Sequence, residues 1–322
     1  MDDILIALEP GTLSCEQIAR VREIAPDGAS VLVTRDRDEI GARIERIEVA
    51  AGWFPADLLP RASNLRWYQQ WSAGADWLLR HPETAEADFV LTNTSGIHAV
   101  PITEHVFALL LAFARELPRA VRAQDGHQWF SQNDHPGLFE LMDKTLLLIG
   151  VGAIGKRIAQ VATVMGMDVL GVRRHPTQDV LHVTSMWGPE DLLDLLPRAD
   201  VVVLTVPLTE ETRGMIGKAE LAAMRETATL INVGRGGTVN EKALALALRN
   251  GQIGRAALDV FEDEPLDERS SLWDLENMII TSHYAGITPR YHERALDVFL
   301  DNLARYTAGA QLRNVVDKDL GY

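Results

Sequence analysis

Short apolar runs that alternate with amphipathic stretches dominate the first hundred residues. Runs rich in aliphatic or aromatic side chains lie at 3–8, 31–34, 47–50 and 89–92, and residues 15–24 have helical periodicity. Strands separated by helical segments are typical of a parallel α/β sheet. The pattern therefore predicts a small α/β domain that is complete before residue 100.

A second series of apolar runs begins near residue 144 and ends near residue 282. Its six predicted strands span 145–149, 169–172, 201–206, 230–233, 257–260 and 278–282. Helical segments separate the strands, as in a doubly wound dinucleotide-binding domain. The expected fold class is α/β, with two doubly wound parallel-sheet domains.

The segment between the two series combines a long apolar helix with an irregular stretch. Pro101 and Glu104 stand where the first turn of a helix favours them, and apolar residues are nearly continuous from 102 to 117. A helix that is apolar all round is buried at a domain junction or a subunit interface. Residues 118–143 show no clear period, so we expect a long connection there, of a kind that is often functional or interfacial.

The predicted strand at 145–149 runs directly into a Gly-x-Gly-x-x-Gly turn at the head of a helix. In this motif Gly150 permits a tight turn, Gly152 lets the backbone approach a pyrophosphate, and Gly155 lets the helix pack on the strand. The phosphates lie at the helix N-terminus, where unpaired N–H groups and the helix dipole attract negative charge. A lone match to this motif is weak. Here the flanking strand and helix favour a dinucleotide site over an ordinary turn.

Length, charge and cysteine content narrow the class of protein. A chain of 322 residues favours two domains, and its net charge of -15 argues against nucleic acid or an anionic membrane as a partner. The single cysteine, Cys15, excludes an intramolecular disulfide framework and a zinc site of clustered cysteines, and we expect no metal. An acidic start and a longest apolar run of only 106–114 favour a cytoplasmic protein without a signal peptide or membrane span.

Polar residues that suit hydride transfer follow three of the predicted strands. Arg235 lies among glycines after the fourth strand, an acidic run at 262–264 follows the fifth, and His283 follows the sixth. Ligands of an open α/β sheet bind beyond the carboxyl ends of its strands. There a histidine exchanges a proton with a substrate oxygen, a carboxylate orients the histidine, and an arginine binds a substrate carboxylate. Spacing does not choose between Glu262 and Glu264.

Each of these residues also has a simpler interpretation. Arg235 would be a surface turn residue, although its three flanking glycines argue for a backbone requirement. The acidic run would be a solvated face, and His283 would be one of nine structural histidines. We prefer His283 only because of its position at a strand end.

Five motifs together resemble those of the D-isomer-specific 2-hydroxyacid dehydrogenases. They are Gly150-Val-Gly-Ala-Ile-Gly155, Pro207-Leu-Thr-Glu-Glu-Thr-Arg-Gly214, Asn232-Val-Gly-Arg-Gly-Gly237, Leu258-Asp-Val-Phe-Glu262 and His283-Tyr-Ala-Gly286. Asn93-Thr-Ser-Gly96 with Glu104-His105 is similar to the domain-crossing segment of that family. The resemblance covers nearly the whole chain. It implies a Rossmann dinucleotide-binding domain and a smaller, flavodoxin-like substrate domain.

The resemblance also implies domain boundaries and the roles of particular residues. The substrate domain would be discontinuous, formed by 1–99 and 288–322, around a dinucleotide-binding domain at 100–287. The implied catalytic residues are Arg235, Glu264 and His283. The backbone amides implied to bind the substrate carboxylate are those of Ser72, Ala73 and Gly74. Glu264 argues against a formate dehydrogenase, because those enzymes carry glutamine at the position of the glutamate that pairs with histidine.

The matched motifs imply cofactor contacts beyond the three glycines of the turn. These contacts are Ala153, Ile154, Val206, Pro207, Thr212, Val233, Gly234 and Asp259. An NAD site normally has an acidic residue at the end of its second strand. Here that strand ends in Arg173 and Arg174, and the nearest acid, Asp168, lies at its beginning. Guanidinium groups fit a 2′-phosphate, so we expect NADP(H), with use of either NADP(H) or NAD(H) as the alternative.

The expected reaction is the reversible reduction of a 2-ketoacid to a D-2-hydroxyacid. The short form of the family resembles glyoxylate/hydroxypyruvate and other 2-ketoacid reductases. The alternatives are a phosphoglycerate dehydrogenase-like enzyme and a nucleotide-sensing, co-repressor-like binding protein. Three aromatic residues, Trp53, Phe54 and Trp71, would either line the substrate pocket or pack in the core. The resemblance further implies a homodimer in which residues 100–143 embrace the partner, with Trp129 reaching toward the partner's active site.

Overall fold

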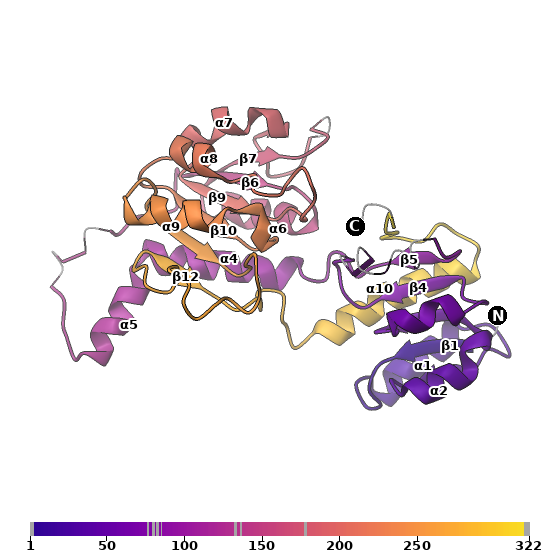
Figure 1. Ribbon diagram of the computed structural model, residues 1–322. Helices are drawn as coiled ribbons and strands as arrows, with labels where there is room; N and C mark the ends of the chain where they lie inside the picture. Colours follow the sequence, from indigo (N-terminus) through magenta and orange to yellow (C-terminus); the bar gives the residue numbers. More distant parts are fainter. Residues whose placement is uncertain are drawn as a thin grey trace. The chain divides into compact units, whose positions relative to one another are not determined.

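The computed structural model describes residues 3–75, 77–78, 81, 84, 86–131, 134–135, 137–176 and 179–318. The chain divides into two compact units (Figure 1). The first unit runs to Ile97 and resumes at Thr288, and the second unit spans His98–Ile287. Each unit is built on its own parallel sheet covered by helices, which confirms the predicted fold class.

The first unit is a five-stranded parallel sheet with strand order β2-β1-β3-β4-β5. Its strands are β1 (Asp3–Ala7), β2 (Val31–Val33), β3 (Ile47–Gly52), β4 (Trp67–Gln70) and β5 (Val90–Thr92), and its helices are α1 (Cys15–Ile24), α2 (Arg37–Arg43) and α10 (Tyr291–Thr307). Successive strand residues point to opposite faces. Leu5 accordingly packs in one hydrophobic core, and its neighbours Ile4 and Ile6 pack in another. Both faces of the sheet are therefore covered.

Helix α10 brings the C-terminal part of the chain into the core of the first unit. Trp67 on β4 is fully buried, and its ring stacks on Phe299 at 5.3 Å and on Tyr306 at 5.5 Å between ring centroids. The indole Nε1 donates to the hydroxyl of Thr92, 2.8 Å away on β5. One side chain thus joins two strands to the C-terminal helix.

Replacing this tryptophan with alanine is expected to lower the free energy of unfolding by about 3–5 kcal/mol, because the cavity left by an aromatic side chain cannot fully collapse. The denaturant midpoint of Trp67→Ala, compared with wild type, measures the loss. Trp53→Ala is the matched control, since Trp53 lies in the same unit and is 42% exposed. Equal midpoints for wild type and Trp67→Ala would contradict the prediction.

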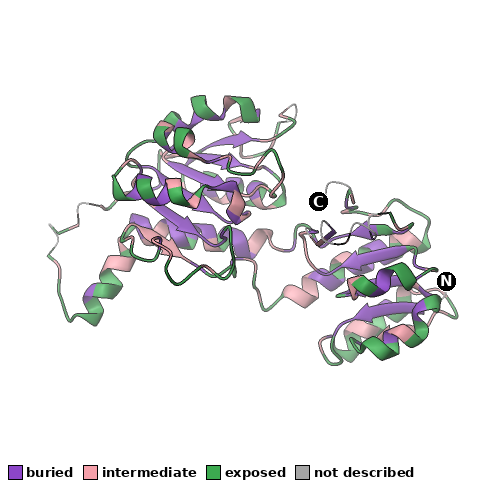
Figure 2. Ribbon diagram, in the orientation of Figure 1, coloured by how far each residue is buried: buried purple, intermediate pink, exposed green. Residues whose placement is uncertain are grey.

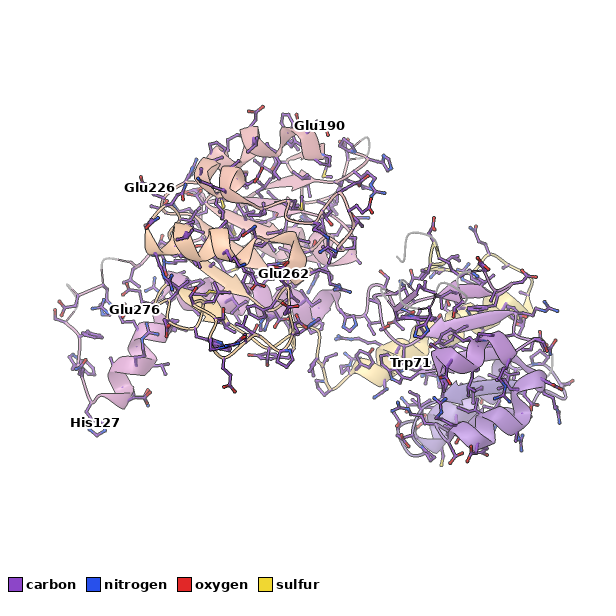
Figure 3. All side chains as sticks on the ribbon, viewed as in Figure 1. Trp71, His127, Glu190, Glu226, Glu262 and Glu276 are labelled. Carbon is purple, nitrogen blue, oxygen red and sulfur yellow. The ribbon has the colours of Figure 1, made fainter. Side chains whose placement is uncertain are left out.

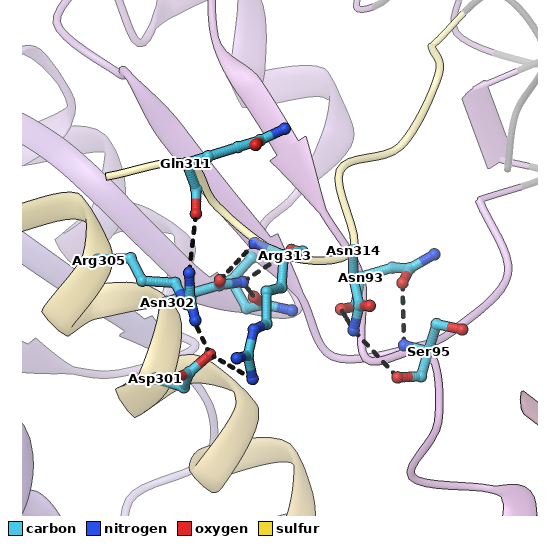
Figure 4. A network of polar contacts seen from close by, with 9 residues as sticks. Asn93, Ser95, Asp301, Asn302, Arg305, Gln311, Arg313 and Asn314 are labelled. Carbon is cyan, nitrogen blue, oxygen red and sulfur yellow. Dashed lines mark hydrogen bonds and ion pairs between the residues drawn. The ribbon is translucent and has the colours of Figure 1, made fainter. Parts of the chain in front are cut away.

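A polar network fastens the segment after α10 to the rest of the first unit (Figure 4). The buried amide of Asn302 donates to Gln69 Oε1 and to the backbone oxygen of Arg313, both at 3.0 Å. Asn314 donates to the backbone oxygen of Asn93 at 3.3 Å. Residues more than two hundred positions apart are joined in this way, which explains why the first unit is discontinuous in sequence.

The second unit is a seven-stranded parallel sheet with strand order β12-β11-β10-β9-β6-β7-β8. Its strands are β6 (Thr145–Ile149), β7 (Asp168–Val172), β8 (Ser185–Trp187), β9 (Val201–Leu204), β10 (Thr229–Asn232), β11 (Arg255–Leu258) and β12 (Met278–Ile280). Its helices are α4 (Ala99–Ala114), α5 (Leu117–Asp125), α6 (Ala153–Val164), α7 (Leu192–Leu195), α8 (Lys218–Ala223) and α9 (Glu241–Arg249). The strand order reverses between β6 and β9, where ligands of such sheets bind.

All six strands predicted for the second unit are present, and β8 is an additional strand. The central strands are buried on both faces because their side chains are almost all aliphatic, as in β9, which reads Val-Val-Val-Leu (Figure 2). The three residues of β8 are only half-buried at the edge of the sheet. A short strand of this kind leaves no continuous apolar run in the sequence, which is why the pattern missed it.

The segment after α4 corrects the prediction of an irregular connection. Residues Leu117–Asp125 form helix α5, which projects from the end of α4 and is mostly exposed (Figures 1 and 2). Only Ala123 of this helix is buried, while Leu117 and Val121 are exposed. Leu117, Ala120 and Val121 do have helical spacing, but the signal is confined to nine residues and is lost when the whole stretch to residue 143 is read together. Among the described helices, none is both long and apolar enough to cross a bilayer.

Candidate active site

The glycine-rich turn after β6 has the geometry that a dinucleotide phosphate requires. Gly150 has a φ of +98°, and its backbone oxygen accepts a hydrogen bond of 2.7 Å from the hydroxyl of Thr205. A Cβ on Gly155 would lie 2.3 Å from that oxygen, whereas a Cβ on Gly152 would meet no atom within 4 Å. Gly152 is also the N-cap of α6, whose first N–H groups have no partner within the helix. The turn therefore leaves open space beside an anion-attracting helix end and fits a nucleotide cofactor.

The two arginines predicted to bind near the cofactor ribose come directly after β7. Arg173 is half-buried, and its backbone N–H donates to the carbonyl of Trp187 at 3.1 Å, which fixes the chain at this point. Arg174 is exposed, and its guanidinium lies 2.6 Å from the carboxylate of Glu211, in the loop after β9. After β7, the sequence has no carboxylate before Asp179. The acidic partner in this region comes from the neighbouring loop instead.

The other residues predicted to contact the cofactor lie at the same edge of the sheet. Thr212 donates from its hydroxyl to the carbonyl of Pro207 at 2.7 Å, which closes the loop after β9. A Cβ on Gly234 would lie 2.7 Å from the carbonyl oxygen of Val206. The loops after β9 and β10 therefore pack backbone against backbone. Val233 leads into the second loop directly from β10 and is buried.

Arg235 is held at the end of β10 by a buried asparagine. Asn232 accepts a hydrogen bond from the N–H of Gly234 and donates one to the carbonyl of Arg235, both at 3.0 Å. A Cβ on the next residue, Gly236, would fall 1.8 Å from the carbonyl carbon of Phe261. Only glycine fits there, and the Arg235 loop consequently lies against the chain segment after β11.

That segment supplies the carboxylate that meets His283. The Nδ1 atom of His283 lies 2.7 Å from Oε2 of Glu264, and the two side chains are 51% and 36% exposed. The other oxygen of Glu264 accepts the N–H of Phe261 at 2.9 Å, so the carboxylate is fixed on both sides. Because a carboxylate only accepts hydrogen bonds, Nδ1 carries the hydrogen, and Nε2 is the nitrogen that an acid–base role would use. Glu262, labelled in Figure 3, is exposed, and its N–H donates to Glu241.

Strand pairing brings Arg235 to the same edge as the histidine–glutamate pair. In the sheet Asn232 pairs with Leu258, and Leu258 with Ile280, so β10, β11 and β12 end at one level. Adjacent strands lie about 4.8 Å apart, so the strand ends that precede Arg235 and His283 are separated by about 10 Å. The structure thus joins His283 to Glu264 directly and places Arg235 along the same edge. Their catalytic roles stay predictions.

Asp259, also predicted to contact the cofactor, is 2% exposed. Its carboxylate accepts hydrogen bonds from the hydroxyl of Thr281 at 2.5 Å and from the N–H of Ala285 at 3.0 Å. The side chain is therefore engaged within the second unit. Its contact with a cofactor stays a prediction.

The loop predicted to bind the substrate carboxylate lies in the first unit and has its carbonyl groups turned inward. Gln70 donates to the carbonyls of Ser72 and Gly74 at 3.0 and 2.7 Å. Asn93 donates to the carbonyl of Ala73 at 2.8 Å. In a planar trans peptide the N–H points opposite to the C=O. The N–H groups of Ala73 and Gly74 therefore point away from these partners, as a carboxylate site requires.

The aromatic residues near this loop divide between core and surface. Phe54 is buried against Tyr68, and Trp71 (Figure 3) is fully buried with its indole Nε1 donating to Nδ1 of His292 at 3.1 Å. Trp53 is 42% exposed. Of the two interpretations, core packing accounts for Phe54 and Trp71, and a role in the substrate pocket stays a prediction for Trp53.

Two buried amides that shape the site were not predicted. Asn232 orders the Arg235 loop, and Gln70 orders the loop at 72–74. Asn232 is fully buried and Gln70 is 1% exposed, each as the last residue of a buried strand. A buried polar group needs hydrogen-bond partners. The available signals were a single amide at the end of β10 and a pair of amides, Gln69 and Gln70, at the end of β4.

Comparisons with known proteins agree with this geometry. The family model described as "D-isomer specific 2-hydroxyacid dehydrogenase, NAD binding domain" matches residues 107–285. A glyoxylate reductase of Aeropyrum pernix is 35% identical over 271 residues, which are 82% of this chain and 80% of the relative.

Two solved structures match nearly the whole chain. A D-isomer specific 2-hydroxyacid dehydrogenase family protein of Aeromonas salmonicida superposes with a TM-score of 0.85 at 31% identity, covering 99% of both chains. An NADPH-dependent glyoxylate/hydroxypyruvate reductase of Sinorhizobium meliloti, in complex with NADP and sulfate, gives a TM-score of 0.80 at 28% identity, covering 100% of both chains. The chain therefore belongs to the D-isomer-specific 2-hydroxyacid dehydrogenases, a family of NAD(P)-dependent oxidoreductases.

Proposed function

We propose that this protein reduces a small 2-ketoacid, of the glyoxylate or hydroxypyruvate type or larger, to the D-2-hydroxyacid with NADP(H). The observation that carries the proposal is the contact of 2.7 Å between His283 and Glu264 at a strand end near that of Arg235. The relatives that are named for glyoxylate and hydroxypyruvate support this substrate class. The bound cofactor supplies a hydride to C2 of the ketoacid.

His283 is the proton donor in this proposal. Its Nε2 gives a proton to the carbonyl oxygen as that oxygen becomes a hydroxyl, and it takes the proton back in the oxidation direction. Glu264 accepts the hydrogen of Nδ1, which fixes the ring orientation and stabilises the imidazolium needed for reduction. Both roles of Glu264 depend on the same hydrogen bond.

Each unit carries donors that suit a substrate anion in this proposal. The guanidinium of Arg235 polarises the carbonyl group and binds the carboxylate with directed N–H donors. The backbone N–H groups of Ala73 and Gly74 offer a second set of donors without any charge of their own. Each set by itself suits the carboxylate of a 2-ketoacid.

The test is the consumption of NADPH and NADH with glyoxylate, hydroxypyruvate, pyruvate, phenylpyruvate and 3-phosphohydroxypyruvate. Turnover of one or more unphosphorylated ketoacids is the expected result. A strong preference for the phosphorylated substrate would favour the phosphoglycerate dehydrogenase-like alternative. No turnover together with intact cofactor binding would favour the co-repressor-like binding protein.

Trp53 is proposed to limit the length of the substrate side chain. An indole that is 42% exposed offers an apolar wall. Trp53→Ala is expected to raise kcat/KM for phenylpyruvate relative to glyoxylate, because removing the ring makes room for a longer substrate. Comparison of kcat/KM for the two substrates in wild type and variant measures the effect. An unchanged ratio of kcat/KM for phenylpyruvate to that for glyoxylate would show that Trp53 does not line the pocket.

We also propose that the protein is a homodimer held by the segment after α4. This segment exposes five large apolar side chains, at Leu117, Val121, Trp129, Leu138 and Met142. Trp129 is 97% exposed, and His127 marks the far end of α5 in Figure 3. A run of exposed apolar residues on one projecting arm is typical of a protein interface. Trp129 is the proposed contribution of this arm to the partner's active site.

Sedimentation equilibrium at micromolar concentration is expected to give twice the chain mass of 35.6 kDa. Val121→Asp should shift the protein toward a monomer, because a charge in an apolar interface loses its hydration. Leu246→Asp is the matched control, since Leu246 is similarly exposed on α9. A monomeric wild type would refute the proposal. A Val121→Asp variant that remains a dimer would show that Val121 lies outside the interface.

A further inference from the structure

Behind His283 lies a buried aspartate, Asp259, whose backbone carbonyl holds the chain at this residue and whose carboxylate holds it at the two residues after it. The carbonyl of Asp259 accepts the N–H of His283 at 2.8 Å. The carboxylate of Asp259 accepts the N–H of Tyr284 at 3.2 Å and that of Ala285 at 3.0 Å. Three successive backbone donors, from 283 to 285, therefore converge on one residue at the end of β11. An aspartate with 2% exposure requires hydrogen bonds of this kind in place of water.

His283 needs such support because its backbone is in the left-handed region, with a φ of +53°. A residue with a Cβ adopts this conformation at a conformational cost and keeps it only where the surroundings determine it. The conformation accompanies the contact between the imidazole and Glu264. Relaxation of the backbone would carry the ring away from the carboxylate that orients it.

Two further side chains complete the arrangement around Asp259. The hydroxyl of Thr281 lies 2.5 Å from Oδ1 of Asp259 and 3.0 Å from Nε2 of His105 on α4. The His105 ring also meets the ring of Tyr284 edge to face, with centroids 5.2 Å apart. The His105 side chain is 13% exposed, and it lies 176 residues from Thr281 along the chain. The helix that begins the second unit thereby braces the turn that carries His283.

The numbers of available hydrogens determine which group donates in the Thr281–Asp259 and His105–Thr281 hydrogen bonds. A hydroxyl has one hydrogen, and Thr281 gives it to the carboxylate of Asp259, which only accepts. Thr281 is then an acceptor toward His105, so the hydrogen of the neutral imidazole lies on Nε2. Burial lowers the pKa of His105 more than the nearby Asp259 raises it, which agrees with a neutral ring.

We propose that His105, Thr281 and Asp259 form a positioning network that holds His283 in its left-handed conformation and so keeps its imidazole on Glu264. The inference rests on the proposed reductase function and extends it to His105 and Thr281, which act through His283 without touching the substrate. The network connects helix α4 to the turn after β12 through a chain of hydrogen bonds.

The first test is a pair of substitutions at Thr281. Thr281→Val keeps the side-chain shape and removes the hydroxyl, and Thr281→Ser keeps the hydroxyl. Misplacement of a reacting group by about 1 Å costs about a hundredfold in rate. Thr281→Val is therefore expected to lower kcat by about tenfold to a hundredfold at saturating cofactor. The substrate KM and the dissociation constant for NADP⁺ should change less than about twofold, because uniform binding is retained. Thr281→Ser should restore most of kcat.

His105 is tested by the same logic. His105→Leu removes the donor to Thr281 and should lower kcat in the same direction, and His105→Gln, which places an amide N–H near the position of Nε2, should lower it less. The matched control is Thr103→Val, because Thr103 is buried on the same helix and its hydroxyl donates to the carbonyl of Ala99. This control should leave kcat unchanged.

Two readouts separate positioning from a general loss of structure. In a His283→Ala background, Thr281→Val should cause no further loss of rate, because the group that it positions is gone. With ¹⁵N-labelled histidine, the Nδ1–H resonance that His283→Ala abolishes should weaken in Thr281→Val and persist in Thr103→Val. Additive losses in the double variant, or an unchanged resonance, would overturn the inference.

The outcomes distinguish this inference from the function on which it rests. If the wild-type protein turns over no ketoacid, the proposed function is refuted. The resonance of the His283 Nδ1–H group then still tests the positioning network. A wild-type protein with turnover and a Thr281→Val variant with unchanged kcat removes the network alone. A Thr281→Val variant that loses NADP⁺ affinity and keeps kcat would overturn the network and assign Asp259 and Thr281 to cofactor binding instead.

Discussion

His283→Ala is expected to lower kcat for 2-ketoacid reduction by about a hundredfold to ten-thousandfold, the usual contribution of a positioned acid–base group. The loss results from the removal of the only proton donor that the proposal places at the carbonyl oxygen. NADP⁺ binding should be retained, because the glycine turn and the N-terminus of α6 lie at other strands of the sheet. Steady-state kinetics together with a fluorescence titration of the cofactor measure both quantities.

The choice between the two glutamates supplies the control for this prediction. Glu264→Gln keeps an acceptor for Nδ1 but loses the charge that stabilises the imidazolium, so an intermediate loss of kcat is expected. Glu262→Gln should behave as wild type, because the Glu262 side chain is exposed two residues away. A His283→Ala variant with more than a tenth of the wild-type kcat, or equal losses for the two glutamine variants, would contradict the assigned roles.

Most strands of both sheets were predictable because their signals are local. The strand β9 and the turn at Gly150 and Gly155 are each recognisable within about ten residues of sequence. The edge strand β8 and the short helix α5 were missed because their signals are weak or brief. The half-buried residues of β8 form no apolar run, and the helical spacing in α5 extends over only nine residues.

The residues of the candidate site were predictable only in part. Arg235 and His283 were found with the rule that ligands bind beyond strand ends. The choice of Glu264 over Glu262 required the family resemblance, and the structure agrees with it through the hydrogen bond to His283. The contacts of Asp259 with Thr281 and His105 depend on the packing of α4 near β12, and no spacing along the chain reveals them.

The choice of nicotinamide cofactor was predicted from the two arginines after β7, and the structure adds a competing charge. A 2′-phosphate at this position would meet the guanidinium groups of Arg173 and Arg174. The carboxylate of Glu211 already lies 2.6 Å from Arg174, with 71% of the Glu211 side chain exposed. An exposed ion pair stabilises its partners by at most about 1 kcal/mol. A phosphate can therefore replace Glu211 as the partner of Arg174 at small cost, and Arg173 is the more buried of the two arginines.

We accordingly expect wild type to use NADPH with a higher kcat/KM than NADH, and Arg173→Asp to reverse the preference. A hydrogen bond to a charged group contributes about 1.5–3 kcal/mol. Its loss lowers kcat/KM for NADPH by about tenfold to a hundredfold. The new carboxylate at 173 would repel the 2′-phosphate and accept a hydrogen bond from the ribose hydroxyl of NADH. The measurement is kcat/KM for both cofactors at fixed ketoacid concentration.

Glu211→Gln is a control with the opposite expected effect, because it removes a negative charge beside Arg174 and leaves both arginines in place. It should raise the affinity for 2′,5′-ADP by about twofold to fivefold, the scale of an exposed ion pair, and leave the affinity for 5′-AMP unchanged. Calorimetric titration of the two nucleotides reports this independently of turnover. A wild-type preference for NADH would refute the proposal of NADP(H). A preference for NADPH that survives both Arg173→Asp and Arg174→Ala would place recognition of the 2′-phosphate outside this pair of arginines.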